Sequence, residues 1–223
     1  MPTGPTALLR RHPRTTLGLA VVLGVAASSL LQWWPQEGRR LSLTPVVAAV
    51  LDDPGSPHAG PASADVTVVV FTDYQCPICK ATDGALALRL ARDPNLKVVY
   101  KDWPIRGPLS DLAARTALAA DRQGLYPQVH DALMAARGGL SPERIAAIAA
   151  QAGADPTRLN ADLAVHAREI DAQLARHNLQ AFSLGLQGTP GYLVGPYLFE
   201  GGLDDRRLEH AIDRARRAGP PRA

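Results

Sequence analysis

The chain has 223 residues, of which 46% are apolar, and a formal net charge of +3. A chain of this length buries enough apolar surface to fold without disulfides or metals, and it suggests one domain, or one domain with a large insertion. Arg10, Arg11 and Arg14 account for the whole charge excess, because residues 1–36 contain no acidic residue. The neutral remainder gives no electrostatic reason to expect a nucleic-acid partner.

Residues 1–36 have the pattern of an export signal. The three arginines precede an uncharged stretch whose most apolar part is Leu17–Leu31, as in a positive n-region followed by an apolar core. Two interpretations stay open: a cleaved signal peptide, or a retained membrane anchor across residues 15–34 with Trp33 and Trp34 in the interfacial belt. Both predict that the rest of the chain lies in the periplasm or at the extracytoplasmic face of the inner membrane.

The next segments predict half of a βαβ unit. Residues 37–64 are expected to form a linker and lead-in, with a short helix within Leu41–Leu51 and a Pro- and Gly-containing loop after it. The β-branched run Val66–Phe71 predicts a central, buried strand. A helix is expected at Lys80–Arg92 and a second strand at Leu96–Lys101, which gives the order strand, helix, strand.

The second half of the chain predicts a helical insertion and then a return to the sheet. The Ala-rich residues 108–185 predict four or five helices, and Ser141 before a proline has the pattern of a helix start. A hairpin is expected at Tyr192–Phe199 and an amphipathic helix at Leu203–Ala218. Residues 219–223 are expected to form a disordered tail.

The two cysteines, Cys76 and Cys79, are separated by two residues. A pair this close staples no long loop and adds little as a structural disulfide, so its position indicates chemistry or a ligand. With Pro77 at the first helical position, Cys76 lies at the helix cap, where unpaired N–H groups and the helix dipole stabilise a thiolate. Cys79, one turn further on, can close the disulfide with Cys76. We therefore expect Cys76 to exchange with clients and Cys79 to resolve the mixed disulfide.

A second candidate element is Gly188-Thr189-Pro190, which precedes the expected hairpin. A proline between a turn and a strand is a candidate for a cis peptide bond. Beside the cysteine pair, such a loop would expose the Thr189 backbone as a short edge for an extended substrate strand.

Alternatives remain for the residues around the cysteines. Asp73 either tunes the thiol or caps the loop, and Lys80 either adds positive charge near Cys76 or faces solvent. Zinc needs about four ligands, and the six histidines are scattered; no metal site is therefore predicted. His166 and His177 are expected on helix surfaces.

The stretch Phe71–Lys80, FTDYQCPICK, with Gly188–Pro190 later and a helical insertion between them, resembles the DsbA-like thiol–disulfide oxidoreductases. It looks closest to the exported branch with an F-x-D-Y-x-C-P-x-C-K signature, and the resemblance covers roughly residues 45–218. It implies an α/β thioredoxin fold over residues 65–218, with a helical domain inserted at about residues 108–185, and a cis bond before Pro190. The residues that match the family's functional positions are Cys76, Cys79, Thr189 and Pro190.

The resemblance implies an exported protein-disulfide oxidoreductase that acts as an oxidase. Its partners would be unfolded or cysteine-containing exported proteins and a membrane redox protein, and the Cys76–Cys79 disulfide would itself be the cofactor. Strong oxidases of this family have His where this chain has Ile78, so we expect a milder oxidant. A reductase or isomerase is the alternative within the class, and an exported copper-binding carrier is the alternative from a different class.

Overall fold

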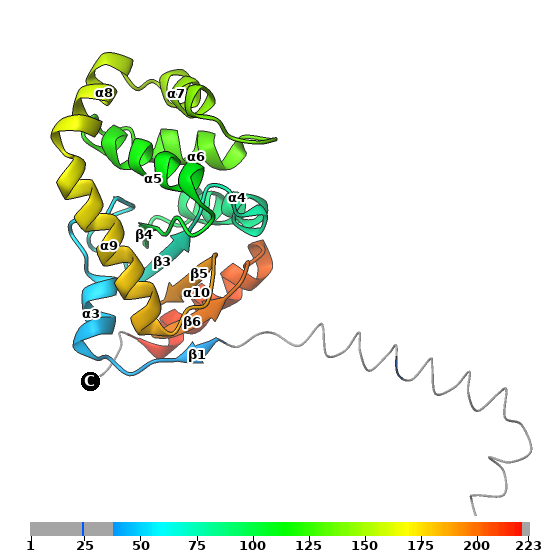
Figure 1. Ribbon diagram of the computed structural model, residues 1–223. Coiled ribbons are helices and arrows are strands. Elements are labelled where there is room, and N and C mark those ends of the chain that lie inside the picture. The colour runs from blue at the N-terminus through cyan, green and yellow to red at the C-terminus, as the bar shows by residue number, and fades with distance from the viewer. Residues whose placement is uncertain (1–23, 25–37, 220–223) are drawn as a thin grey trace, which may run out of the picture. The chain divides into compact units, whose positions relative to one another are not determined.

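A mixed sheet lies at the centre of the computed structural model (Figure 1). The structure describes residue 24 and residues 38–219, so the predicted signal or anchor, Gly24 apart, and residues 220–223 of the predicted tail lie outside the described residues. The strands are β1 (Arg39–Arg40), β2 (His58–Ala59), β3 (Val66–Thr72), β4 (Leu96–Asp102), β5 (Gly191–Val194) and β6 (Tyr197–Glu200). The helices are α3 (Pro45–Leu51), α4 (Pro77–Arg92), α5 (Pro108–Asp121), α6 (Tyr126–Ala135), α7 (Pro142–Gln151), α8 (Pro156–Val165), α9 (Ala167–Leu184) and α10 (Asp205–Ala218).

The strand order is β1-β6-β5-β3-β4-β2. The two predicted strands β3 and β4 are parallel neighbours joined by α4, and the hairpin β5–β6 adds antiparallel to β3 with Phe71 opposite Gly191. This register places the start of β5 beside the end of β3. The loops that carry the cysteine pair and Thr189-Pro190 therefore meet at the same edge of the sheet.

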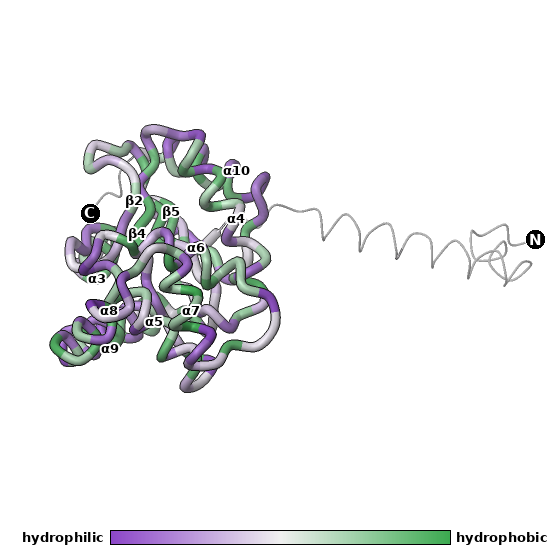
Figure 2. The backbone as a smooth tube through the Cα atoms, turned by 90° about the horizontal axis from the view of Figure 1, so that it is seen from above, coloured by the Kyte–Doolittle hydropathy of each residue, from purple (hydrophilic) through white to green (hydrophobic). Residues whose placement is uncertain are grey.

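Both faces of β3 are covered, as its continuous apolar run predicted. Val68 and Val70 belong to a core cluster shared with α4 and α10, whereas Val69 and Phe71 belong to one shared with α3 and α9. Figure 2 shows hydrophobic and hydrophilic residues interspersed along the helices, which is the pattern of elements with one buried side. The predicted thioredoxin fold with an inserted helical domain is confirmed.

The insertion runs from α5 to α9. Figure 1 shows α5–α8 gathered together, with α9 returning beside the sheet towards α3. The predicted start at Ser141 is confirmed, since its hydroxyl accepts the Arg144 N–H at 3.2 Å. Asp155 caps α8 in the same way: its carboxylate accepts a hydrogen bond from the backbone N–H of Arg158 at 2.7 Å. These caps satisfy backbone donors that the first turn of a helix leaves unpaired.

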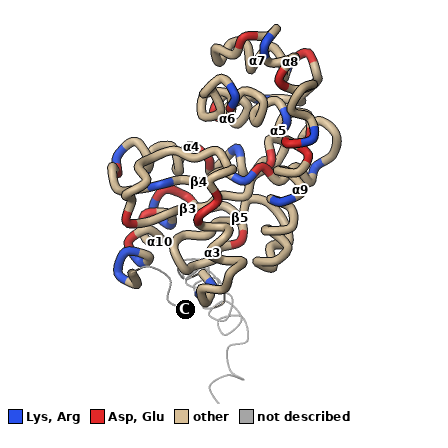
Figure 3. Tube along the Cα trace, turned by 90° about the vertical axis from the view of Figure 1, so that its left-hand side faces the viewer, with Lys and Arg blue, Asp and Glu red and all other residues tan. Residues whose placement is uncertain are grey.

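Charged residues of both signs are distributed over the fold (Figure 3). Arg89 of α4 pairs with Asp205 and Glu209 of α10, at 2.6 and 2.7 Å. These pairs hold the two helices side by side on one face of the sheet. Among the described residues, no helix combines the length and the apolar character needed to cross a bilayer.

The segment predicted as a linker, residues 37–64, contributes β1, α3 and β2 to the fold. Lys101 of β4 is fully buried and donates to the Asp53 carboxylate at 2.5 Å and to the Ser56 hydroxyl at 2.9 Å. Ser56 in turn lies 2.9 Å from Nε2 of His177. The prediction of His177 on a helix surface is wrong: the folded lead-in covers it, and burial lowers its pKa to about 3.

A buried polar chain joins the insertion to the sheet. Tyr74 lies 3.0 Å from Nδ1 of His130 in α6 and donates to the Tyr126 hydroxyl at 3.5 Å, and Tyr126 donates to the Asp102 carboxylate at 3.1 Å. The direction of the hydrogen bond between Tyr74 and Nδ1 of His130 depends on the protonation state of the ring. Nε2 of His130 donates to Asp83 of α4 at 3.1 Å. When protonated, His130 is an imidazolium that donates through both ring nitrogens, to Tyr74 and to Asp83.

The pKa values agree with this arrangement. Burial opposes charge on His130, but the hydrogen bond to Asp83 and the charges of Asp83 and Asp102 outweigh it and raise the pKa of His130 above its ordinary value. Burial raises the pKa of Asp102 to about 6. A raised histidine pKa means that its stabilising contribution is complete below the ordinary value of about 6.5 and is lost as the pH rises through the folded-state value.

His130→Gln is therefore expected to destabilise the protein more at pH 5.5 than at pH 9. At pH 5.5 the loss of the charged hydrogen bond to Asp83 costs roughly 1.5–3 kcal/mol of unfolding free energy, and at pH 9 the wild type has itself lost this contribution. Urea unfolding at both pH values measures the difference. His210→Gln, on the exposed side of α10, is the matched control. An equal loss at the two pH values would contradict the imidazolium assignment.

Candidate active site

The turn between β3 and α4 is built around Asp73. Its buried carboxylate accepts hydrogen bonds from the Gln75 N–H and the Ser110 hydroxyl, both at 2.7 Å, and from the Arg106 N–H at 3.0 Å. The Cys76 N–H donates to the Asp73 carbonyl at 3.0 Å. The side chain of Asp73 thus has the loop-capping position, one of the two alternatives, and it fixes the point at which α4 begins.

Cys76 occupies the N-cap of α4, and Pro77 is the first helical residue. The Cys76 sulfur accepts the Cys79 N–H at 3.4 Å and lies 3.3 Å from the Thr189 carbonyl oxygen. As a thiolate it faces N–H donors at the helix start, and as a thiol it can donate to the Thr189 carbonyl. The predicted cap position of Cys76 and the predicted first helical residue, Pro77, are therefore confirmed.

The two thiols have opposite pKa shifts. A hydrogen bond from the Cys79 thiol lowers the pKa of Cys76 to about 5, against the effect of burial and with help from the Cys79 and Ile78 N–H groups and Thr189. The same hydrogen bond and burial raise the pKa of Cys79 well above its ordinary value, although Thr72 acts in the opposite direction. In the reduced pair, one sulfur is thus the thiolate and the other retains its proton.

The two cysteines do not differ in burial. Cys76 is 0% exposed and Cys79 is 2% exposed, and both are free thiols. The exposed part of the motif is Pro77 together with Ile78, whose exposure is 51%. A client sulfur therefore reaches Cys76 only when neighbouring groups move.

The loop from Thr189 approaches Cys76 from the far end of the sequence. The peptide bond between Thr189 and Pro190 is cis, as the family resemblance implied. The Pro190 carbonyl accepts the Gly201 N–H at 2.9 Å, which anchors this loop to the segment after β6. The structure thus brings together Cys76, Cys79, Thr189 and Pro190, the four residues singled out from the sequence.

Lys80 is half-buried and does not face solvent, the second of the two roles considered for it. Its ammonium donates to the carbonyl oxygens of Leu133, at 2.5 Å, and Ala136, at 3.1 Å, and lies 3.4 Å from that of Met134. These carbonyls end α6, where a helix has unpaired acceptors. Lys80 therefore attaches the insertion to α4. Burial, followed by repulsion from Arg137 and Arg144, lowers the pKa of Lys80.

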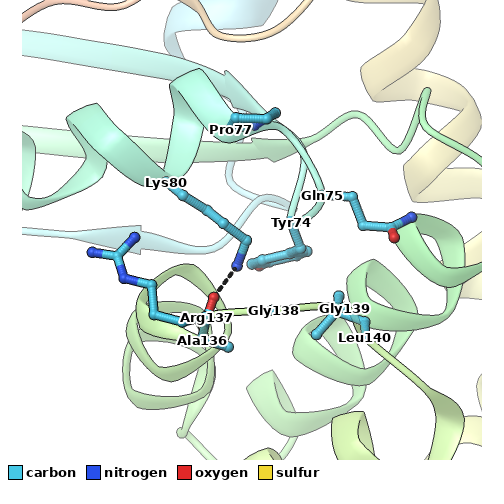
Figure 4. Close-up of a pocket in the computed structure, with 9 residues that line it drawn as sticks. All are labelled: Tyr74, Gln75, Pro77, Lys80, Ala136, Arg137, Gly138, Gly139 and Leu140. Carbon is cyan, nitrogen blue, oxygen red and sulfur yellow. Dashed lines mark hydrogen bonds between the residues drawn. The ribbon is translucent and has the colours of Figure 1, made fainter.

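A cleft of about 370 Å³ lies between the start of α4 and the loop from α6 to α7 (Figure 4). Gln75 and Pro77, the two chain neighbours of Cys76, are part of its lining, so the cleft adjoins the redox pair. Its lining residues are Tyr74, Gln75, Pro77, Lys80, Ala136, Arg137, Gly138, Gly139 and Leu140. The insertion side of this cleft was missed from the sequence, where Gly138-Gly139 was the available signal of a close approach.

The described residues also include one cluster with metal-ligand types. Ligand atoms of Asp83, His130 and Asp131 lie within 4.8 Å of one another. Two members, Asp83 and His130, already share the hydrogen bond at the insertion interface. This geometry gives His130 a structural partner in place of an ion.

Comparisons with known proteins identify the family of this chain. The family described as "DSBA-like thioredoxin domain" matches residues 67–213. A thioredoxin-like oxidoreductase from Silicibacter pomeroyi is 39% identical, with a TM-score of 0.72 over 77% of this chain and 98% of its own. The thiol-disulfide exchange protein alpha-DsbA2 from Wolbachia pipientis is 30% identical, with a TM-score of 0.72 over 75% and 90%.

Two further similarities extend this set. A periplasmic thioredoxin-like protein from Salmonella enterica serovar Typhimurium is 30% identical, with a TM-score of 0.71 over 78% of this chain and 98% of its own. Among curated proteins, a Na(+)/H(+) antiporter NhaA 1 from Salinispora arenicola is 27% identical over 88% of this chain, which spans only 32% of that protein's length. The family match over residues 67–213, together with the solved oxidoreductases, shows that this chain belongs to the DSBA-like family of thiol–disulfide oxidoreductases.

Proposed function

We propose that the protein is an extracytoplasmic dithiol oxidase that passes the Cys76–Cys79 disulfide to cysteine-containing clients. The observation that carries this proposal is the thiolate stabilisation of Cys76 at the start of α4. Stabilising the thiolate favours the reduced form of the pair and therefore makes its disulfide a stronger oxidant.

The exchange takes two steps. A client thiolate attacks the Cys76 sulfur of the oxidised pair, the Cys76–Cys79 bond breaks, and Cys79 leaves and takes up a proton. A second client thiolate then attacks the client sulfur of the mixed disulfide and expels Cys76 as a thiolate. Two electrons pass from the client to the pair, and a thiol with a low pKa is the better leaving group for the second step.

Thr189 and Pro190 are proposed to hold the client next to the redox pair. The Thr189 carbonyl already lies 3.3 Å from the Cys76 sulfur, so a strand laid along this loop would bring its own cysteine close to Cys76. A membrane redox protein is proposed to reoxidise the pair, which needs no other cofactor. Pro77 and Ile78 are proposed to tune the pair through the N–H geometry of the first turn.

An extracytoplasmic location is supported by the export pattern of residues 1–36 and by the periplasmic relative from Salmonella. A disulfide persists there, whereas cytosolic conditions would reduce it. Alkaline phosphatase fused after Gly219 is expected to be active in cells, and a fusion that lacks residues 1–36 is expected to be inactive. Activity of the truncated fusion would contradict export by this segment.

The direction of electron flow is decided by the reduction potential. The potential of the Cys76–Cys79 pair, measured by equilibration with glutathione, is expected between about −270 mV, typical of a thioredoxin, and about −120 mV, typical of a strong oxidase. Ile78 provides no hydrogen-bond donor from its side chain, so the upper limit is not expected to be reached. A value at or below about −270 mV would assign the protein as a reductase.

Substitutions of the two cysteines are expected to have different effects on disulfide exchange. Cys76→Ser should reduce dithiol oxidation of a two-cysteine peptide at least about 10³-fold, since Cys76 is the sulfur that clients attack. Cys79→Ser cannot form the internal disulfide; its Cys76 should accumulate in mixed disulfides formed by attack on client disulfides, because no neighbouring thiol displaces the client. Non-reducing gels and mass spectrometry report both results. Full activity of Cys76→Ser, or copper bound stoichiometrically by the reduced protein, would favour the carrier instead.

A further inference from the structure

The cleft beside Cys76 has a rigid floor. Lys80 holds the carbonyls at the end of α6, and Arg144 donates to the carbonyl oxygens of Gly139, at 2.5 Å, and of Arg137. The loop of residues 136–140 is thus fixed through its carbonyl oxygens by two cations from different helices. Its side chains and N–H groups remain for other partners.

The cleft carries excess positive charge. Arg137 is exposed, and within residues 38–219 its guanidinium has no hydrogen-bond or ion-pair partner. In Figure 4, the Arg137 side chain extends from the loop towards α4, and the Lys80 side chain extends from α4 towards the loop. Arg137 and Arg144 both repel the Lys80 ammonium, so three cations lie close enough to interact at this side of the cleft. Asp83, the carboxylate whose charge acts on Lys80 in the opposite direction, is already bonded to His130.

The same loop also has unused donors. Among the described residues, the backbone N–H groups of Gly138, Gly139 and Leu140 donate to neither a backbone nor a side-chain acceptor. A Cβ at Gly139 would meet nothing within 4 Å, so a ligand can approach this part of the backbone closely. A guanidinium and free N–H groups around one cleft are the donors that recognise a carboxylate.

We propose that this cleft selects clients that carry an acidic side chain next to the reactive cysteine. The carboxylate binds Arg137 and the N–H groups of the Gly138-Gly139 loop while the client sulfur meets Cys76. The proximity follows from Gln75 and Pro77, which line the cleft on either side of Cys76. This inference rests on the proposed function, since it names the class of client that the redox pair would accept.

The test measures formation of the mixed disulfide. In a Cys79→Ser background, Cys76 thiolate reacts with single-cysteine peptides activated as 2-pyridyl disulfides. The bond from Cys76 to the peptide sulfur forms, the peptide–pyridyl bond breaks, and pyridine-2-thione is released and read by its absorbance. Peptides with Glu, Gln or Lys beside the cysteine are compared, each normalised to its rate with 2-mercaptoethanol.

The Glu peptides are expected to react about three- to fivefold faster than the Gln peptides, and the Lys peptides slowest, as for a partly exposed charge pair. The preference should shrink in 0.5 M NaCl because salt screens such pairs. Arg137→Gln should bring the Glu-to-Gln ratio to about one, and Arg137→Lys should retain part of the preference. Arg168→Gln, an exposed arginine of α9 outside the cleft, is the matched control and should keep the full ratio.

Two results would overturn the inference. Equal normalised rates for the three peptides, or a preference that survives Arg137→Gln, would show that the cleft does not read the client's charge while leaving the oxidase proposal intact. If no peptide reacted with Cys76 in the Cys79→Ser protein, the proposed function would fail together with the inference.

Discussion

The chemistry of this protein depends on how the Cys76 sulfur is held at the start of α4. One side of the sulfur faces the Cys79 N–H of the first turn, and the other faces the carbonyl of Thr189. The first contact is local, because Pro77 begins the helix directly after the cap residue. The second depends on the sheet, since β5 pairs with β3 and thereby places the Thr189 loop at the edge where β3 ends. The N–H groups of the helix start favour the thiolate, whereas the Thr189 carbonyl at the sheet edge accepts a hydrogen bond only from the protonated sulfur.

The insertion is attached to the same helix. Lys80 binds the carbonyl end of α6, and Asp83, less than one turn further along α4, accepts from the buried His130. Tyr74, two residues before Cys76, completes this interface by contacting His130. Because these groups lie in low-dielectric surroundings, satisfied hydrogen bonds fix a single arrangement. The helix that carries the redox pair is thus also the support for the loop that closes the adjacent cleft.

Several elements of the fold were predictable because their signals are local. The strand at Val66–Phe71, the helix start at Ser141 and the hairpin at Tyr192–Phe199 all appear where the sequence placed them. The two-residue strands β1 and β2 were not predicted. Strands this short have no periodicity of their own and exist only because they pair with the edges of the sheet. His177 was misassigned for a related reason: the lead-in that buries it lies more than 100 residues away in sequence.

For the active site, the sequence by itself determined the spacing of Cys76 and Cys79, the proline that starts their helix, and the likeness to the DsbA-like oxidoreductases. These features involve residues only a few positions apart, and over such short separations the backbone can adopt only a few conformations. Only the tertiary structure decided that Asp73 holds the turn, that Lys80 binds the end of α6 instead of facing solvent, and that a positively charged cleft adjoins Cys76. Each of these contacts joins segments dozens of residues apart, and a hydrogen-bond partner that distant leaves no trace in local composition or periodicity.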